Sequence, residues 1–162
     1  MKKFTLLILI PCFLLCGCDN NALSKSVRLS GKTFYRIWDD RGFGQSNVIR
    51  SKTTFIHFYD NNTYSYWSYS EGHGYHVNLH YYKVVENLLF IADNSMYQQF
   101  NGMNGFDDIT SEILDDYHKL YPFENISSYD FYCEVSNNML LFDPIVFATE
   151  TAAKELGVVF YD

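Results

Sequence analysis

The sequence predicts a mainly β protein, a β-rich α+β chain in which an antiparallel meander forms a small barrel or sandwich with one or two covering helices. Long stretches alternate apolar, often aromatic, residues with polar residues. This period of two is typical of strands that bury one face. Short turns rich in Asn and Asp separate these stretches, and such turns favour hairpins between antiparallel neighbours. Strands therefore dominate the predicted fold, and helices cover it.

The strand segments follow one another with short connections. The expected segments, a single strand and then three hairpins, are residues 32–38, 53–70, 75–93 and 129–143. The hairpins are expected to turn at 60–62, at Glu86-Asn87 and at Asn137-Asn138. Asn and Asp adopt the left-handed backbone of tight turns more readily than other side chains. Each pair of arms should therefore form adjacent antiparallel strands.

Helical spacing is expected in two places. In residues 107–122 the apolar residues recur every three or four positions, at Ile109, Ile113, Leu114, Tyr117 and Leu120. Asp108 is the expected N-cap, and Pro122 lies just past the expected end. A shorter helix is expected over 149–156, capped by Thr149 and closed by Gly157.

The N-terminal residues form a separate unit. Lys2 and Lys3 make a positive head, and the uncharged run 4–15 follows it. That run is shorter than the roughly 20 residues of a membrane-spanning helix, but it fits the apolar region of a signal peptide. A small residue, Gly17, stands directly before Cys18.

The stretch Leu15-Cys16-Gly17-Cys18 resembles the lipobox of bacterial lipoprotein precursors. The resemblance implies that residues 1–17 are removed and that Cys18 carries S-diacylglycerol and an N-acyl chain. An ordinary cleaved signal peptide or an N-terminal anchor helix is the alternative. Residues 18–26 are then a lipidated tether, and 27–162 a single β-rich domain. No other cofactor is expected, and Cys133 is the thiol that remains, predicted to be a buried small hydrophobic residue.

The residues after the lipidated cysteine bear on the destination of the protein. In enterobacterial lipoproteins, an Asp at this position acts as a signal against export to the outer membrane. Here the position holds Asp19, followed by Asn20. The resemblance therefore implies a lipid-anchored protein on the periplasmic side, with the inner membrane favoured over the outer membrane.

Charge narrows the choice of partner. The chain has a net charge of −7, and loss of Lys2 and Lys3 with the signal peptide leaves −9. Proteins that bind nucleic acids or anionic lipid surfaces do so through clustered Lys and Arg. The acidic charge of this chain therefore argues against both kinds of partner. Membrane attachment should depend on the lipid anchor alone.

Three histidines close in sequence, His73, His76 and His80, raise the question of a metal site. On a strand, His76 and His80 share a face but stand about 13 Å apart at ~3.3 Å per residue. Zinc requires ligand nitrogens at about 2.0–2.1 Å. We therefore expect no metal site and exposed strand histidines, with a pH-sensitive contact as the alternative.

Catalytic motifs are lacking in the sequence. It contains no Gly-x-Ser-x-Gly elbow, HExxH or P-loop. The acidic pairs Asp39-Asp40, Asp107-Asp108 and Asp115-Asp116 are expected to be solvated, and Gly42-Phe43-Gly44 to be a loop. The apolar surroundings of Cys133 disfavour a thiolate. The protein is therefore not expected to be an enzyme.

The high density of aromatic residues suggests that the protein binds a partner, because Tyr is enriched at binding surfaces as well as in strands. The predicted binding residues are Tyr64, Tyr66, Trp67 and Tyr69. We expect a non-catalytic interaction module that meets an envelope or membrane protein. A self-protection role, conjugative exclusion or toxin immunity, fits its small size, lipid anchor and composition typical of AT-rich coding. The alternatives are a lipocalin-like carrier of a small apolar ligand and, less favoured, an envelope hydrolase. A filled interior with exposed Tyr would favour the interaction module, and an open interior the carrier.

Overall fold

The computed structural model describes residues 27–38, 48–93, 98–142 and 145–161. The predicted signal peptide, the lipidation residue Cys18 and the sorting residues Asp19 and Asn20 lie outside the described residues. So do the acidic pair at 39–40 and the glycine loop at 42–44.

The described chain consists mostly of strands. These are β1 (Thr33–Trp38), β2 (Val48–Ser51), β3 (Thr54–Phe58), β4 (Thr63–Ser70), β5 (Gly74–Val85), β6 (Leu88–Ala92), β7 (Gln98–Asn101), β8 (Tyr129–Val135), β9 (Met139–Phe142), β10 (Ile145–Ala148) and β11 (Val158–Tyr161). The helices are α1 (Ser111–Leu120) and α2 (Glu150–Glu155), and the short 3₁₀ turns are η2 (Phe106–Asp108) and η3 (Phe123–Asn125).

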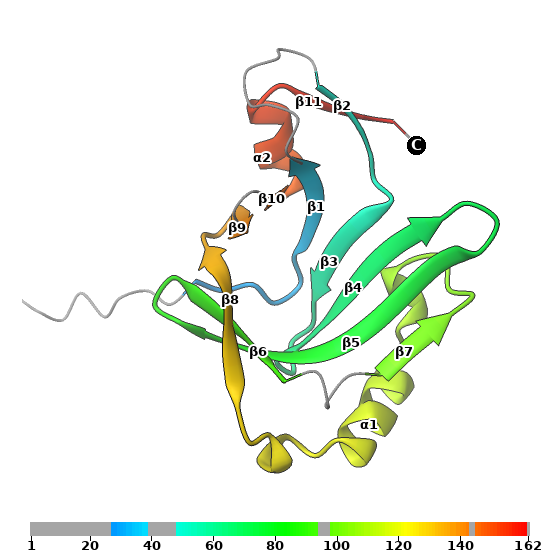
Figure 1. Cartoon of the computed structure of the whole chain (residues 1–162), viewed down its shortest axis with the longest axis vertical. Helices are drawn as coiled ribbons and strands as arrows, with labels where there is room; N and C mark the ends of the chain where they lie inside the picture. The colour runs from blue at the N-terminus through cyan, green and yellow to red at the C-terminus, as the bar shows by residue number, and fades with distance from the viewer. Residues whose placement is uncertain (1–26, 39–47, 94–97, 143–144, 162) are drawn as a thin grey trace, which may run out of the picture.

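Eight of the strands close into an antiparallel barrel (Figure 1). Its order is β4-β3-β1-β10-β9-β8-β6-β5, and pairing of β4 with β5 completes the circle. β5 is long enough to pair with β6 through its second half and with β7 through its first half. The prediction of a mainly β fold with covering helices is confirmed, and the arrangement is a barrel rather than a sandwich.

The three predicted hairpins form where the sequence places them, as β3–β4, β5–β6 and β8–β9. In the first turn Asn62 has a φ of 59°, the left-handed conformation that Asn tolerates. In the second turn it is Glu86, not its Asn neighbour, that has a positive φ of 58°. A left-handed Glu is uncommon, so this turn is held by the pairing of the two strands that it joins.

Four strands were not predicted: β2, β7, β10 and β11. Each has four residues, too few for an alternating pattern to be recognised. β2 pairs in parallel with β11, so the C-terminal apolar run joins a small second sheet. β10 lies between β1 and β9, and therefore links the first strand to the last hairpin of the barrel.

The start of the main helix differs from the prediction, because Thr110 and not Asp108 is its N-cap. The hydroxyl of Thr110 accepts a hydrogen bond from the Ile113 backbone N–H. Asp108 instead caps the preceding 3₁₀ turn, where its carboxylate accepts the Asn104 backbone N–H at 2.7 Å. The predicted end before Pro122 and the Thr149 cap of α2 are both confirmed.

The core has an inner and two outer parts. The inner cluster draws on every barrel strand, and its buried members on the strands are Phe34, Ile56, Phe58, Tyr64, Tyr82, Leu89, Cys133, Val135, Leu140 and Phe147. A second cluster lies between α1 and the outer surface of β3, β4 and β5, and it includes Phe55, Trp67, Leu79 and Tyr117. A third lies where α2 packs against β1 and β10. The two helices thus cover separate parts of the outside of the barrel (Figure 1).

Candidate interaction surface

Aromatic rings in contact cross the interior of the barrel. Phe58 lies 5.7 Å from Tyr64 between ring centroids, and Tyr64 lies 6.5 Å from Tyr132. Tyr132 contacts Phe142 at 4.4 Å, and Phe142 contacts Phe147 at 5.5 Å. Tyr64 belongs to β4 and Tyr132 to β8, with β5 and β6 between them. The rings therefore connect opposite walls, as expected for a barrel of eight strands whose side chains fill it.

The four predicted binding aromatics on β4 do not form one surface. Tyr64 and Trp67 are 2% and 0% exposed, and Tyr66 is half-buried against the inner cluster. Tyr69 is 50% exposed, near the turn that joins β4 to β5. The reason is that β4 is covered on both faces, by the barrel interior and by the layer containing α1. Among these four residues, an external partner can make its main contact only with Tyr69.

The three clustered histidines occupy different environments. His73 is exposed in the β4–β5 turn, and His76 bonds the Asn101 side-chain oxygen at 3.2 Å. The expectation of an exposed residue is wrong for His80, which points into the barrel and stacks on Tyr64 at 5.1 Å. Its burial lowers the pKa of the imidazole from 6.5 to about 4. Within the described ranges, no three His, Cys, Asp or Glu side chains are grouped closely enough to hold a metal ion.

The residues considered for catalysis are not brought together in the described part of the chain. The acidic pairs Asp107-Asp108 and Asp115-Asp116 are exposed on η2 and α1. Cys133 is buried in the inner cluster, as expected, and its burial raises the pKa of the thiol to about 12. A thiol of that pKa is protonated at neutral pH and is a poor nucleophile.

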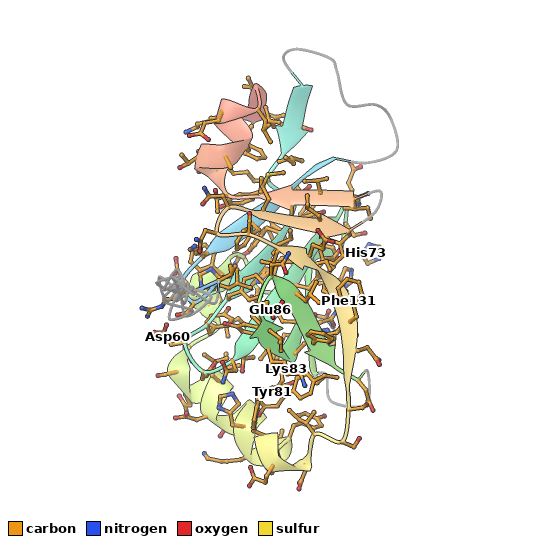
Figure 2. All side chains as sticks on the ribbon, turned by 90° about the vertical axis from the view of Figure 1, so that its left-hand side faces the viewer. Asp60, His73, Tyr81, Lys83, Glu86 and Phe131 are labelled. Atoms are coloured by element: carbon orange, nitrogen blue, oxygen red, sulfur yellow. The ribbon has the colours of Figure 1, made fainter. Side chains whose placement is uncertain are left out.

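A surface that the sequence did not reveal lies on the outside of β5, β6, β8 and β9, between the regions that α1 and α2 cover. We call it the β6–β8 face, and its residues are Lys83, Val85, Leu88, Phe90, Phe131, Glu134 and Leu141. Strand register places Lys83, Phe90 and Phe131 in one row. Figure 2 shows Lys83 and Phe131 on the side that faces the viewer, between the two helices.

The β6–β8 face is apolar and open to solvent. Phe131, Val85 and Leu141 are 58%, 51% and 45% exposed, and Phe131 packs edge-on against Phe90 at 6.0 Å. The Lys83 ammonium lies over the Tyr129 ring at 4.2 Å, a cation–π contact. Lys83 and Glu134 stand among these apolar side chains, and exposed apolar residues gathered on one face are a common mark of a protein interaction site. No local pattern could identify it, because register between separate hairpins brings its residues together.

A second surface feature is a groove between the β3–β4 turn and the end of α1. Its volume is about 410 Å³, and it is lined by Asn61, Asn62, Tyr81, His118, Pro122, Phe123 and Glu124. Tyr81, one of the lining residues, lies close to α1 (Figure 2). We refer to it as the α1-end groove.

None of the helices in the described residues is both long enough and apolar enough to cross a membrane. Comparison of the chain with protein families, with curated proteins and with solved structures finds no match.

Proposed function

We propose that this chain is a lipid-anchored lipoprotein of the bacterial envelope that acts as a non-catalytic protein-interaction module, and that its β6–β8 face is the contact surface. The observation that carries the proposal is the group of exposed apolar side chains on this face, Phe131, Val85 and Leu141. Phe131, the most exposed aromatic residue on it, is 58% exposed. Aromatic side chains, Phe included, are enriched in the cores of protein interfaces.

The packed interior supports an interaction module over a carrier. A lipocalin-like carrier needs an open chamber for its apolar ligand. Here the Tyr64–Tyr132 contact and the Tyr132–Phe142 contact occupy the middle of the barrel. The aromatic residues that the sequence concentrates in the strands therefore serve mainly as core, and contact with a partner falls to the outer surface.

The anchor and the destination are part of the same proposal. Lipidation at Cys18 would hold the domain at the membrane, and Asp19 would keep it at the inner membrane, facing the periplasm. The partner would then be an envelope or membrane protein. A conjugation channel or a toxin that acts at the inner membrane suits a self-protection role.

A photo-crosslinking residue placed at Phe131 in living cells tests the contact surface. Benzoylphenylalanine at this position should give one dominant adduct with an envelope protein after irradiation. The matched control is the same residue at Leu156, which is 49% exposed but lies after α2, away from the β6–β8 face.

Two further outcomes complete the test. A negative charge introduced on the face, Val85→Glu, should abolish the Phe131 adduct while the far-ultraviolet circular dichroism spectrum stays unchanged. The proposal fails if Phe131 and Leu156 give the same set of adducts, or if neither gives any. It also fails if the purified protein retains a stoichiometric apolar ligand, which would favour the carrier.

A further inference from the structure

The α1-end groove has a rigid aromatic floor. Tyr81 is 1% exposed and its hydroxyl donates a hydrogen bond to the Tyr121 carbonyl at 2.6 Å. His118 stacks on the Tyr81 ring at 5.4 Å with an interplanar angle of 19°. The His118 Nε2 atom is held by a hydrogen bond with the buried Thr63 hydroxyl at 2.9 Å. The floor is therefore fixed before any ligand arrives, which lowers the entropic cost of binding.

One wall of the groove is an exposed aromatic ring. Phe123 packs edge-on against Tyr81 at 5.5 Å, and yet it is 49% exposed. Another part of the lining is the β3–β4 turn, whose Asn61 and Asn62 side chains are exposed. That turn is anchored by a hydrogen bond from the Tyr82 backbone N–H to the Asn62 carbonyl at 2.8 Å. The lining of the groove thus includes an exposed aromatic ring and exposed side-chain amides.

The electrostatic character of the groove is negative. Glu124 belongs to its lining, and the carboxylate is close enough to Tyr81 to contribute to the raised pKa of that hydroxyl, after burial and Tyr129. The C-terminal end of α1 adds the partial negative charge of its last carbonyls. Burial lowers the pKa of His118 below its ordinary 6.5, so this imidazole is neutral at pH 7 and does not offset Glu124.

The lysines that the structure describes near the groove are engaged elsewhere. Lys119, on the last turn of α1, pairs with Asp116 at 2.9 Å. Lys83 lies over the Tyr129 ring at 4.2 Å. Within the described part of the chain, neither Lys119 nor Lys83 forms an ion pair with Glu124. The groove therefore holds an exposed carboxylate beside aromatic rings, a combination that favours a cation.

We propose that the α1-end groove binds an arginine side chain presented by the protein partner. A guanidinium is planar, stacks on an aromatic face and donates several hydrogen bonds at fixed angles. Phe123 supplies the face, Glu124 the charge and the Asn61 and Asn62 amides further acceptors. A lysine ammonium supplies the charge but not the planar stacking surface, and a neutral group supplies no charge.

This inference rests on the proposed function, because a protein partner must supply the side chain. It adds the chemistry of that partner, which is a segment with an exposed arginine that approaches an acidic protein; the chain has a net charge of −7, and −9 without Lys2 and Lys3. The attraction also acts at a distance, because opposite charge on two proteins speeds their encounter.

A titration with small amino-acid derivatives tests the groove without the partner. The full chain, purified in detergent micelles, is titrated with N-acetyl-arginine amide, N-acetyl-lysine amide and N-acetyl-citrulline amide. Citrulline has the shape of arginine without its charge. Arginine should bind about tenfold more tightly than citrulline, with lysine between them. Amide chemical shifts of the residues in the groove should report the binding.

Matched variants decide whether the groove is responsible. Glu124→Gln should weaken arginine binding about fivefold, and Phe123→Ala should remove the difference between arginine and lysine. Glu112→Gln removes the same charge from the exposed first turn of α1 and should leave binding unchanged. Equal binding of arginine and citrulline, equal effects of the two Glu variants, or chemical-shift changes that map elsewhere would each overturn the inference.

The arginine titration and the Phe131 crosslinking experiment test the two proposals separately. If arginine does not bind but Phe131 still gives one dominant adduct, the arginine groove is wrong and the interaction module stands. If arginine binds selectively but Phe131 gives no adduct, the contact surface on β6–β8 is wrong and the groove stands.

Discussion

Acid should destabilise this fold through His80. The imidazole lies inside the barrel, stacked on Tyr64 at 5.1 Å, and burial lowers its pKa from 6.5 to about 4. In the unfolded chain the same group titrates near 6.5. Between pH 6.5 and pH 4 the unfolded state therefore binds a proton that the folded state resists, and the stability present above pH 6.5 is lost as the pH falls.

The size of the effect follows from linkage. Lowering the pKa from 6.5 to about 4 corresponds to about 3 kcal/mol at the most, since each unit of pKa is worth about 1.4 kcal/mol. Most of this, about 2 to 3 kcal/mol, is lost by pH 4.5. That is a large part of the roughly 5–15 kcal/mol by which a domain is stable.

The assay is urea unfolding at pH 7 and at pH 4.5, followed by circular dichroism, for the wild type and for His80→Gln. Gln is neutral at both pH values, so the variant should lose about 2 to 3 kcal/mol less than the wild type between them. Other groups, such as Glu150, whose pKa is lowered by Lys154 and Lys52, contribute equally to both proteins and cancel.

His73→Gln is the matched control, because His73 is exposed in the β4–β5 turn. It should show the same loss of stability in acid as the wild type. Identical losses in all three proteins would refute the placement of His80 in a water-poor interior.

Four further predictions concern the anchor, the destination, metal binding and one turn. Cys18→Ala should leave an unprocessed precursor that incorporates no labelled palmitate, and normal labelling of this variant would show that Cys18 is not the acceptor. Wild-type protein should band with inner-membrane markers in a density gradient and Asp19→Ser with outer-membrane markers; wild type in the outer-membrane fraction contradicts the sorting prediction. EDTA should leave the melting temperature unchanged, because strand spacing separates the clustered histidines, and a fall in melting temperature that zinc reverses would overturn this. Glu86→Asn should raise the free energy of unfolding by about 0.5–1 kcal/mol, since the φ of 58° at this position suits Asn better than Glu; an unchanged urea midpoint would mean that the turn is not strained.

Much of the secondary structure was predictable because it depends on neighbours in sequence. The alternation in 53–70 and 75–93 specifies strands, and the turns between their arms appear where Asn-bearing pairs stand. The cap of α2 by Thr149 follows from the hydrogen bond that a hydroxyl can make with the first turn of a helix. The N-cap of α1 was predicted two residues too early. Asp108 and Thr110 are both residue types that cap helices well, and the backbone conformation of the folded chain decides which of them is the cap.

The candidate sites were much less predictable, and β4 shows why. Its aromatic residues have the composition of a binding surface, but Trp67 is 0% exposed because α1 and β7 cover that face. Phe131, by contrast, lies in an apolar run that resembles any core strand, and it is 58% exposed. Hydrophobicity predicts that a side chain prefers burial, but whether another element arrives to bury it depends on the rest of the fold.

The sequence by itself determined the longer strands, their hairpin turns, the cap of α2, the acidic charge and the pattern that resembles a lipoprotein signal. All of these depend on residues within a few positions of one another. Only the tertiary structure decided that β4 meets β5 and β1 meets β10 to close a barrel, that His80 faces inward, and that Lys83, Phe90 and Phe131 share one open row. The physical reason is register: side chains alternate between the two faces of a strand, so the pairing of distant strands decides which residues meet and which face is left uncovered.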